Sequence, residues 1–239
     1  MKIGIITDVH NNLIALKTVV EKFISLKCDK IICSGDIIGI GPFPEETVKY
    51  LMQIPNLIAV CGNHEKYLTN GMPNKYRGND TMTEEELQYH KWEHGLLSEE
   101  SVNFLKSLPC RIDTCIEDRK ITVIHYAMDQ NGNYVNFKHD PSEEDLEFIF
   151  KEIDSDIIIY GHNHKRNICN GDKFYINVGS LGCPSSDKNI ARAGLLNIEN
   201  GNYDLHIVEI PYDVNSVIGI IDKLRFPACN TIKKYFYGL

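Results

Sequence analysis

Side chains that bind divalent metal ions follow five short apolar runs of this sequence. In chain order these residues are Asp8 and His10, Asp36, Asn63 and His64, His125, and finally His162 and His164. A buried strand ends where its apolar run ends, and open α/β sheets bind their ligands outside the carboxyl ends of the strands. We therefore expect two aspartates, one asparagine and five histidines to gather at one rim of one sheet.

The mixture of side chains indicates the kind of ion that they would hold. Oxygen and nitrogen ligands together suit Mn, Fe, Co or Zn better than Ca, and they exclude a structural zinc site built on thiolates. Asp36 has candidate ligands before and after it, so its carboxylate is the best candidate to bridge two ions. Glycine precedes three of the groups, at Gly35, Gly62 and Gly161, where a sharply turning strand needs a residue without a side chain.

The elements that must position these residues alternate between strands and helices, which indicates an α/β architecture. Asn11 or Asn12 can cap a helix over residues 13–23 that follows the first run. A second helix is expected to begin near Pro44, and a third over residues 142–153 leads into the fifth run. Each helix would return the chain to the start of the next strand.

An insert over residues 66–110 interrupts this alternation directly after the third group of candidate ligands. It opens with a polar loop over residues 69–81, and Thr83 and Glu86 then have the spacing of a helix capping box. One helix is expected from there to about Leu97 and another over residues 98–108. Because the insert leaves the rim beside the candidate ligands, we expect it to form a cap or side wall over the site.

The C-terminal third reads as strands followed by a short helix. Residues 174–178, 193–198 and 203–210 have the pattern of antiparallel strands, with Asn200-Gly201 as a hairpin turn. The last 25 or so residues then hold a short amphipathic helix with an aromatic end. Because the chain has no internal repeat or low-complexity linker, we expect one domain over residues 1–239, with the insert as a helical cap.

Charge and composition limit the classes of partner and compartment. With 25 basic and 33 acidic residues the net charge is −8, which argues against a long nucleic acid as the main partner. No apolar stretch approaches the roughly 18–20 residues of a membrane span, and Asp8 interrupts the run that a signal peptide would need. The eight cysteines form no Cys-x-x-Cys pair, so we expect free thiols, a reducing compartment and a cytoplasmic location.

Five motifs occur in a fixed order along nearly the whole chain. They are Asp8-x-His10, Gly35-Asp36-x-x-Gly39, Gly62-Asn63-His64-Glu65, His125 and Gly161-His162-x-His164. This ordered set resembles the calcineurin-like metallophosphoesterase superfamily, and segments 39–42, 105–109 and 177–182 resemble its prokaryotic predicted-phosphodiesterase branch. The resemblance implies a four-layer αββα sandwich, in which two mixed β-sheets are flanked by helices.

The resemblance also implies a role for each candidate residue. The metal ligands would be Asp8, His10, Asp36 and His164 for one ion, and Asp36, Asn63, His125 and His162 for the other. His64 would act as general acid or stabilise the leaving oxygen, so His64 and Asp36 are the expected catalytic residues. The sequence departs from the family at Tyr126, where glycine is usual, and at Glu65, where aspartate is also common.

The reaction that these residues imply is hydrolysis of a phosphate ester at two divalent or trivalent transition-metal ions. Two ions about 3.5–4 Å apart lower the pKa of a bridging water, so a bridging hydroxide attacks phosphorus without a protein nucleophile. We expect a small phosphodiester or nucleotide-type substrate, because the polar insert would narrow access for a folded phosphoprotein. The alternatives are a phosphomonoesterase or protein phosphatase of the same fold, and a non-catalytic metal-binding scaffold.

Several residues near the motifs have both a functional and a structural interpretation. Asn12 would either cap a helix or contact phosphate, and Arg192 would either bind phosphate or form a structural salt bridge. His90 and His94 have a helical i, i+4 spacing that can bind metal, although a solvated helix face is favoured. For Trp92, packing of the insert is favoured over stacking on a nucleobase.

Overall fold

The strands of the protein form two five-stranded sheets. The computed structural model describes residues 1–72, 82–128, 134–135, 137–183 and 188–239. The strands are β1 (Lys2–Ile6), β2 (Lys30–Cys33), β3 (Leu57–Ala59), β4 (Arg111–Ile116), β5 (Arg119–Ile124), β6 (Ile157–Ile159), β7 (Asn167–Asn170), β8 (Phe174–Asn177), β9 (Ile190–Glu199) and β10 (Asn202–Pro211). The first sheet has the order β10-β9-β1-β2-β3, and the second has the order β4-β5-β6-β8-β7.

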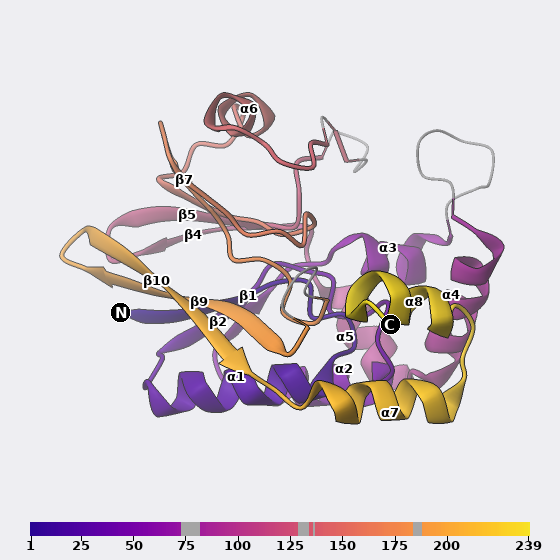
Figure 1. The fold of residues 1–239 in the computed structure, drawn as a ribbon. Coiled ribbons are helices and arrows are strands. Elements are labelled where there is room, and N and C mark those ends of the chain that lie inside the picture. Colours follow the sequence, from indigo (N-terminus) through magenta and orange to yellow (C-terminus); the bar gives the residue numbers. More distant parts are fainter. Residues whose placement is uncertain (73–81, 129–133, 136, 184–187) are drawn as a thin grey trace.

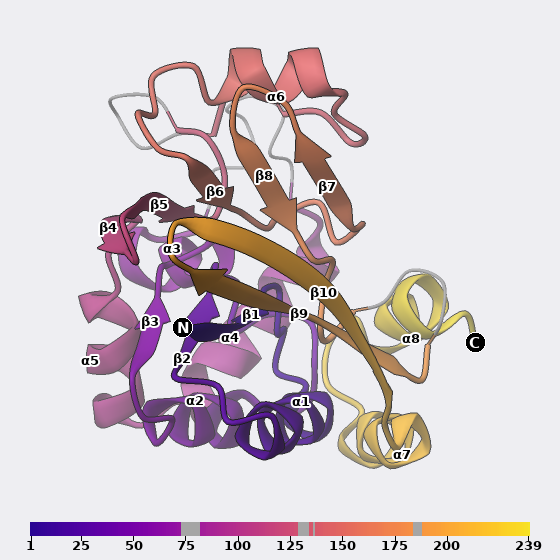
Figure 2. The same cartoon turned by 90° about the vertical axis from the view of Figure 1, so that its left-hand side faces the viewer.

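Helices lie on the outer faces of both sheets and beyond one end of their strands (Figure 1). They are α1 (Leu13–Ser25), α2 (Pro44–Met52), α3 (Asn63–Asn70), α4 (Glu84–Leu96), α5 (Glu99–Ser107), α6 (Glu143–Ile149), α7 (Val214–Leu224) and α8 (Cys229–Tyr237). Helices α1 and α2 lie below the first sheet and α6 lies above the second (Figure 2). The expected four-layer αββα sandwich is therefore confirmed. Within the described ranges, no helix is long and apolar enough to cross a membrane.

The alternation of side chains along each strand explains how the layers pack. In β1, Ile3 and Ile5 join the apolar core between the two sheets, whereas Ile6 faces the core between the first sheet and α1. In β6, Ile157 and Ile159 face the first sheet, whereas Ile158 packs with α6. Successive side chains of a strand point to opposite faces, so strands buried on both sides read as continuous apolar runs.

The five apolar runs that precede the candidate ligands divide between the two sheets. Strands β1, β2 and β3 run parallel in the first sheet, and β5 and β6 run parallel in the second. The expectation of one rim of one sheet is wrong, because β4 pairs antiparallel with β5 and so begins a second sheet after α5. The two rims still meet, since the amide of Leu181, after β8, donates to the carbonyl of Thr7, after β1, at 3.0 Å.

Local capping and turn signals agree with the structure. Asn12 caps α1 by accepting a hydrogen bond from the amide of Ala15 at 3.1 Å. Thr83 begins α4 with the expected capping box, in which the Glu86 carboxylate accepts from the Thr83 amide at 2.7 Å. Asn200 and Gly201 have φ values of 52° and 74°, as a two-residue hairpin turn between β9 and β10 requires.

Other parts of the fold differ from expectation. Helix α3 begins at Asn63, within a segment where no helix was expected, and two helices rather than one follow β10. Strand β8 pairs in parallel with β6 instead of joining the β9–β10 hairpin. Most of the polar loop expected over residues 69–81 lies outside the described residues.

Two glycine substitutions are expected to have opposite effects on the free energy of unfolding, one at the contact of β1 with α1 and one on the open surface of α7. A Cβ atom at Gly4 would lie 2.5 Å from the ring of the buried Phe23, whereas one at Gly219, inside α7, would meet no atom within 4 Å. Gly4→Ala is expected to lower the free energy of unfolding by about 1–3 kcal/mol. Gly219→Ala is expected to raise it by about 0.5–1 kcal/mol, because glycine loses more backbone entropy in a helix. Urea denaturation of both variants measures the difference, and equal effects would contradict the packing described.

Candidate metal centre

The candidate ligands lie on loops at the place where the two sheets meet. Backbone hydrogen bonds join these loops to one another. The amides of Asp8 and His10, after β1, donate to the carbonyls of Gly35 and Asp36, after β2, each at 3.0 Å. In the second sheet, the amide of Gly161 donates to the carbonyl of His125 at 2.9 Å. Within each sheet, the loops that follow neighbouring parallel strands are therefore held together through their backbones.

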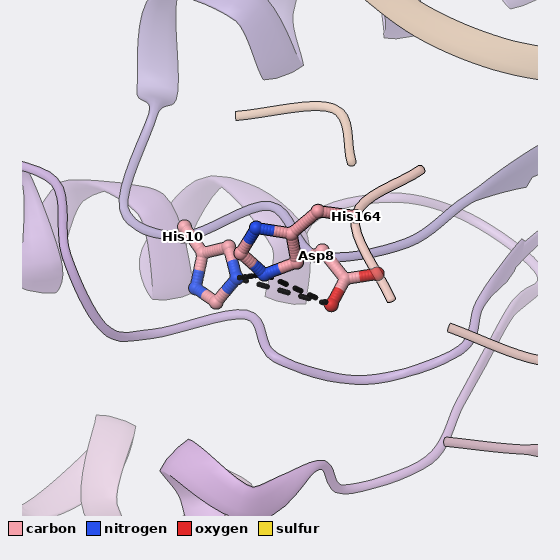
Figure 3. A group of neighbouring side chains, drawn as sticks. All are labelled: Asp8, His10 and His164. Atoms are coloured by element: carbon pink, nitrogen blue, oxygen red, sulfur yellow. Dashed lines mark hydrogen bonds and ion pairs between the residues drawn. The ribbon is translucent and has the colours of Figure 1, made fainter. Parts of the chain in front are cut away.

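Asp8, His10 and His164 form a first group of side chains (Figure 3). The Nε2 atoms of the two histidines face each other at 2.8 Å. Asp8 Oδ1 lies 3.7 Å from Nε2 of His164 and 3.8 Å from Nε2 of His10. The side chains of Asp8 and His10 are completely buried, whereas that of His164 is 23% exposed.

Asp36, His125 and His162 form a second group, which Asn63 joins. Asp36 Oδ2 lies 3.2 Å from Nε2 of His125. The side-chain oxygen of Asn63 lies 2.9 Å from Nδ1 of His162 and 3.3 Å from Nε2 of His125. Asn63 is the first residue of α3, and this helix start is what brings its amide to the centre.

Asp36 connects the two groups. Its Oδ2 atom lies 3.2 Å from His125 in the second group and 3.9 Å from Nε2 of His10 in the first. Its Oδ1 atom accepts a hydrogen bond from the amide of His64 at 3.0 Å, which fixes the orientation of the carboxylate. Asp36 thus lies between the two groups of side chains.

Backbone carbonyls hold two of the histidine rings with their other nitrogen directed at the centre. Nδ1 of His125 lies 2.8 Å from the carbonyl oxygen of Ser34, and Nδ1 of His10 lies 3.2 Å from that of Ile38. A carbonyl accepts only, so Nδ1 of a neutral ring carries the proton and Nε2 presents a lone pair. Metal-binding histidines are commonly oriented by such a bond.

Left-handed backbone conformations concentrate among the candidate ligands. The φ values are 50° for Asp8, 49° for His10, 50° for Asp36, 74° for His162 and 53° for His164. Each non-glycine residue in this region costs on the order of 1 kcal/mol, and such strain gathers at functional sites. The loops therefore hold these side chains in one orientation at the expense of stability.

Charge within the centre depends on histidine. Burial alone would lower the pKa of His125, but the carboxylates of Asp36 and Asp8 outweigh it and raise the pKa to about 9. Burial raises the pKa of Asp8 and lowers that of His162 to about 3. In the described part of the chain, every ion pair of Asp8 and Asp36 is with a histidine. Buried carboxylates beside imidazole rings are a donor set that fits transition-metal ions.

A sequence model described as a calcineurin-like phosphoesterase superfamily domain matches residues 1–201. The chain belongs to this superfamily. An uncharacterized protein from Methanocaldococcus jannaschii is 27% identical over 255 residues, which cover 94% of this chain and 93% of the relative.

Two solved structures have the same fold as this superfamily member. A hypothetical protein from Pyrococcus horikoshii OT3 has a TM-score of 0.82 at 18% identity, covering 98% of this chain and 97% of its own. A metallophosphoesterase from Sphaerobacter thermophilus has a TM-score of 0.74 at 20% identity, covering 99% of this chain and 98% of its own. At these identities the likeness bears on the fold alone.

His64 lies at the mouth of the centre of this calcineurin-like chain. Its Nε2 atom is 3.9 Å from Asp36 Oδ2, and its side chain is 15% exposed. Burial lowers the pKa of His64 to about 4. A Cβ atom at Gly39 would lie 2.3 Å from His64 Nδ1, so the ring fits only because residue 39 is glycine. The family motif Gly35-Asp36-x-x-Gly39 therefore includes a residue that makes room for this histidine.

A cavity of about 620 Å³ opens onto the centre. Asp36, Asn63, His64, His162 and His164 form its inner end. Its walls include Tyr67 of α3, Tyr89 and His90 of α4, and Tyr235 and Phe236 of α8. The insert thus contributes part of the cavity wall, and the C-terminal helix contributes another part that no sequence signal predicted.

The two residues considered as substrate contacts are engaged elsewhere. Asn12 caps α1 through its side-chain oxygen, and its side-chain nitrogen donates to the Gly182 carbonyl at 3.0 Å. Arg192 is 8% exposed and lies 3.6 Å from Glu209 on the paired strand. Neither is among the residues that line the cavity. The structure therefore supports the helix cap and the salt bridge over contact with phosphate.

The insert helix corrects one expectation and agrees with another. The expected solvated face at His90 and His94 is wrong, because His90 is 3% and Glu93 0% exposed, although the His94 side chain keeps 17% of its surface. This face packs against the loops that follow β1 and β2. Trp92 packs within the fold, stacked on Phe226 with ring centroids 4.5 Å apart.

Glu65 is a residue of the centre whose role was open. Its carboxylate accepts hydrogen bonds from the amides of Asp36 at 3.0 Å, Ile37 at 2.9 Å, Ile38 at 3.0 Å and Gly62 at 2.6 Å. It therefore holds the loop after β2 against the start of α3. Burial and the nearby Asp36 raise the pKa of Glu65 to about 7, while these backbone donors act in the opposite direction. Only the Glu65 position beside Asn63-His64 pointed to this residue in the sequence.

The four bonds of Glu65 predict a large and graded effect of substitution. Glu65→Ala leaves four amides without an acceptor and is expected to lower the free energy of unfolding by more than about 3 kcal/mol. Glu65→Gln keeps one acceptor oxygen and should lose less. Urea denaturation measures both, with the exposed Glu152→Gln as control. A Glu65→Ala variant as stable as the control would contradict the role of this carboxylate.

Proposed function

We propose that the protein hydrolyses a small phosphate ester at two transition-metal ions. The observation that carries this proposal is the position of Asp36 between two groups of ligands, 3.2 Å from His125 and 3.9 Å from His10. The proposed ligands are Asp8, His10, Asp36 and His164 for one ion, and Asp36, Asn63, His125 and His162 for the other. Membership of the superfamily supports metal-dependent phosphoesterase chemistry.

The bound ions would polarise the phosphoryl group and lower the pKa of a water between them. The residues of the chain would position the ions and the rings that bind them. Asp36 would set the spacing of the two ion positions, and the carbonyl bonds of His10 and His125 would keep their rings in place as the substrate binds. Burial of Asp8, His10, Asp36 and His125 lowers the local dielectric constant, which strengthens the electrostatic interactions among them.

His64 is proposed to act on the oxygen that leaves phosphorus. Its ring lines the cavity beside the proposed ligands, and the orientation of Asp36 depends on its backbone amide. Because burial lowers the pKa of His64 to about 4, the neutral ring prevails at neutral pH. This supports stabilisation of the leaving oxygen by an N–H donor over transfer of a proton from an imidazolium.

The cavity supports a small phosphodiester or nucleotide-type substrate. Walls on two sides, from α4 and α8, narrow the approach that a folded phosphoprotein would need. Tyr67 of α3 and Tyr235 and Phe236 of α8 offer aromatic surface to the cavity. Such surface suits an aromatic ester group or a nucleobase, since aromatic side chains bury large apolar area and stack on flat rings.

Metal dependence is the first test of this proposal. After chelation the protein is expected not to hydrolyse a chromogenic phosphodiester, and added Mn²⁺ should restore turnover. Asp36→Asn removes a charge shared by both ligand groups, so metal content and turnover should fall together. Absorbance of the released phenolate and elemental analysis measure the two quantities. Activity without metal, or full activity in Asp36→Asn, would overturn the proposal, and bound metal without turnover on diesters or monoesters would favour a scaffold.

A second test separates His64 from the ligands. His64→Ala is expected to lower kcat by about 10²–10³ while the metal content stays unchanged, because the ring donates a hydrogen bond to the leaving oxygen. The loss should shrink with a good leaving group such as a nitrophenolate, which needs less stabilisation. Steady-state kinetics on two esters that differ in leaving-group pKa measure this. Loss of metal in His64→Ala would instead make His64 a ligand.

A further inference from the structure

A separate cluster of metal-binding side chains lies on α4, outside the two groups of the centre. His90, Glu93 and His94 occupy positions i, i+3 and i+4, so they share one face of the helix. One ligand atom from each lies within 4.8 Å of the other two. His90 and Glu93 are buried and the side chain of His94 is 17% exposed, so the cluster is inside the protein but near its surface.

The carboxylate of Glu93 is held so that its two oxygens have different roles. Oε1 accepts hydrogen bonds from the amide of Gly39 and the side-chain nitrogen of Asn11, and Tyr89 Oη lies 3.4 Å away. Oε2 is directed at the two histidines, 3.0 Å from Nδ1 of His90 and 3.9 Å from Nε2 of His94. The loops after β1 and β2 therefore fix the orientation in which Oε2 faces both rings.

His94 carries the observation that points to a ligand. Its Nε2 atom is buried and has no hydrogen-bond partner among the described residues. Burial lowers the pKa of His94, so the neutral ring presents a lone pair or an unused N–H at neutral pH. A buried polar atom without a partner costs on the order of 1–3 kcal/mol. A metal ion bound by Nε2 would remove this cost.

Two of the three separations within the cluster are close to those around one tetrahedral ion, and the third is no more than 4.8 Å. Ligands about 2.0–2.2 Å from zinc lie about 3.4 Å from one another. The separations of 3.0 Å and 3.9 Å lie on either side of this value, so small side-chain rotations would make them equal. The spacing His90-x-x-Glu93-His94 is also one in which two histidines of a helix hold zinc in metalloenzymes.

We propose that His90 Nδ1, Glu93 Oε2 and His94 Nε2 bind a third divalent ion of the zinc or cobalt type. The ion takes the place of the proton between His90 and Glu93. Three protein ligands leave the fourth tetrahedral position to water or another small ligand. His90 lines the cavity, and its ring centroid lies 5.1 Å from that of His64. The site therefore adds positive charge to the cavity wall beside the proposed reaction centre.

Stoichiometric titration with Co²⁺ tests the site in the full-length, metal-stripped protein, because tetrahedral cobalt absorbs strongly in the visible range. The wild type is expected to bind three ions and His94→Ala two. Asp36→Asn should bind one, and the variant with both substitutions none. His206→Ala removes a histidine that is 62% exposed and paired with Asp204, so it should still bind three ions.

These counts separate the third site from the two-metal centre. Binding of two ions by both the wild type and His94→Ala would overturn the third site and leave the proposed centre intact. Binding of one ion by the wild type and none by His94→Ala would support the third site and overturn the centre. Loss of the third ion in His206→Ala as well as in His94→Ala would reveal surface binding and also overturn the inference. Urea denaturation of His94→Ala checks that it is folded.

Discussion

The rest of this structure depends on the need to compensate the charge of two buried carboxylates, Asp8 and Asp36. Asp8 and Asp36 lie where two sheets meet, and burial of an ionised carboxylate is costly unless charge or hydrogen bonds compensate it. Histidines and backbone amides provide this compensation, including the amide of His162 at 3.1 Å from Asp8 and that of His64 at 3.0 Å from Asp36. The carboxylates therefore remain available to cations, because no lysine or arginine of the described residues pairs with them.

Such an arrangement opposes folding, and the sandwich must stabilise it. Left-handed conformations at five candidate ligands together cost several kcal/mol. The apolar core between the sheets holds the strands that precede these loops, with Ile3, Ile5 and Ile32 from one sheet against Val123 and Ile159 from the other. Because the strands are rigid, the loops can keep an orientation that would be unfavourable in a free peptide. Glu65 adds a local restraint by accepting from four amides of two loops.

The candidate ligands could be predicted from sequence because their signal is local. Each follows an apolar run, and the end of a strand can be recognised without knowing its neighbours. The number of sheets could not be predicted in this way, since the residues of a strand do not specify its partners, and β6 pairs with β5 and β8 rather than with the strands of the first sheet. For the same reason the part of the cavity wall formed by α8 was not predicted, since α8 lies more than a hundred residues after α4 in the sequence. Glu65 and Glu93 were missed as structural acceptors, because their partners are backbone amides that carry no residue-type signal.

The insert is better described as part of the centre than as a cap placed over it. Through Glu93, α4 is bonded to Gly39 after β2 and to Asn11 after β1, and both loops carry candidate ligands. Gly39 in turn makes room for His64, whose ring lies beside His90 of the same helix. A displacement of α4 would therefore change the cavity wall, the position of the His64 ring and the hydrogen bonds that hold both loops. In this protein, the segment that shapes the cavity also stabilises the conformation of the candidate ligands.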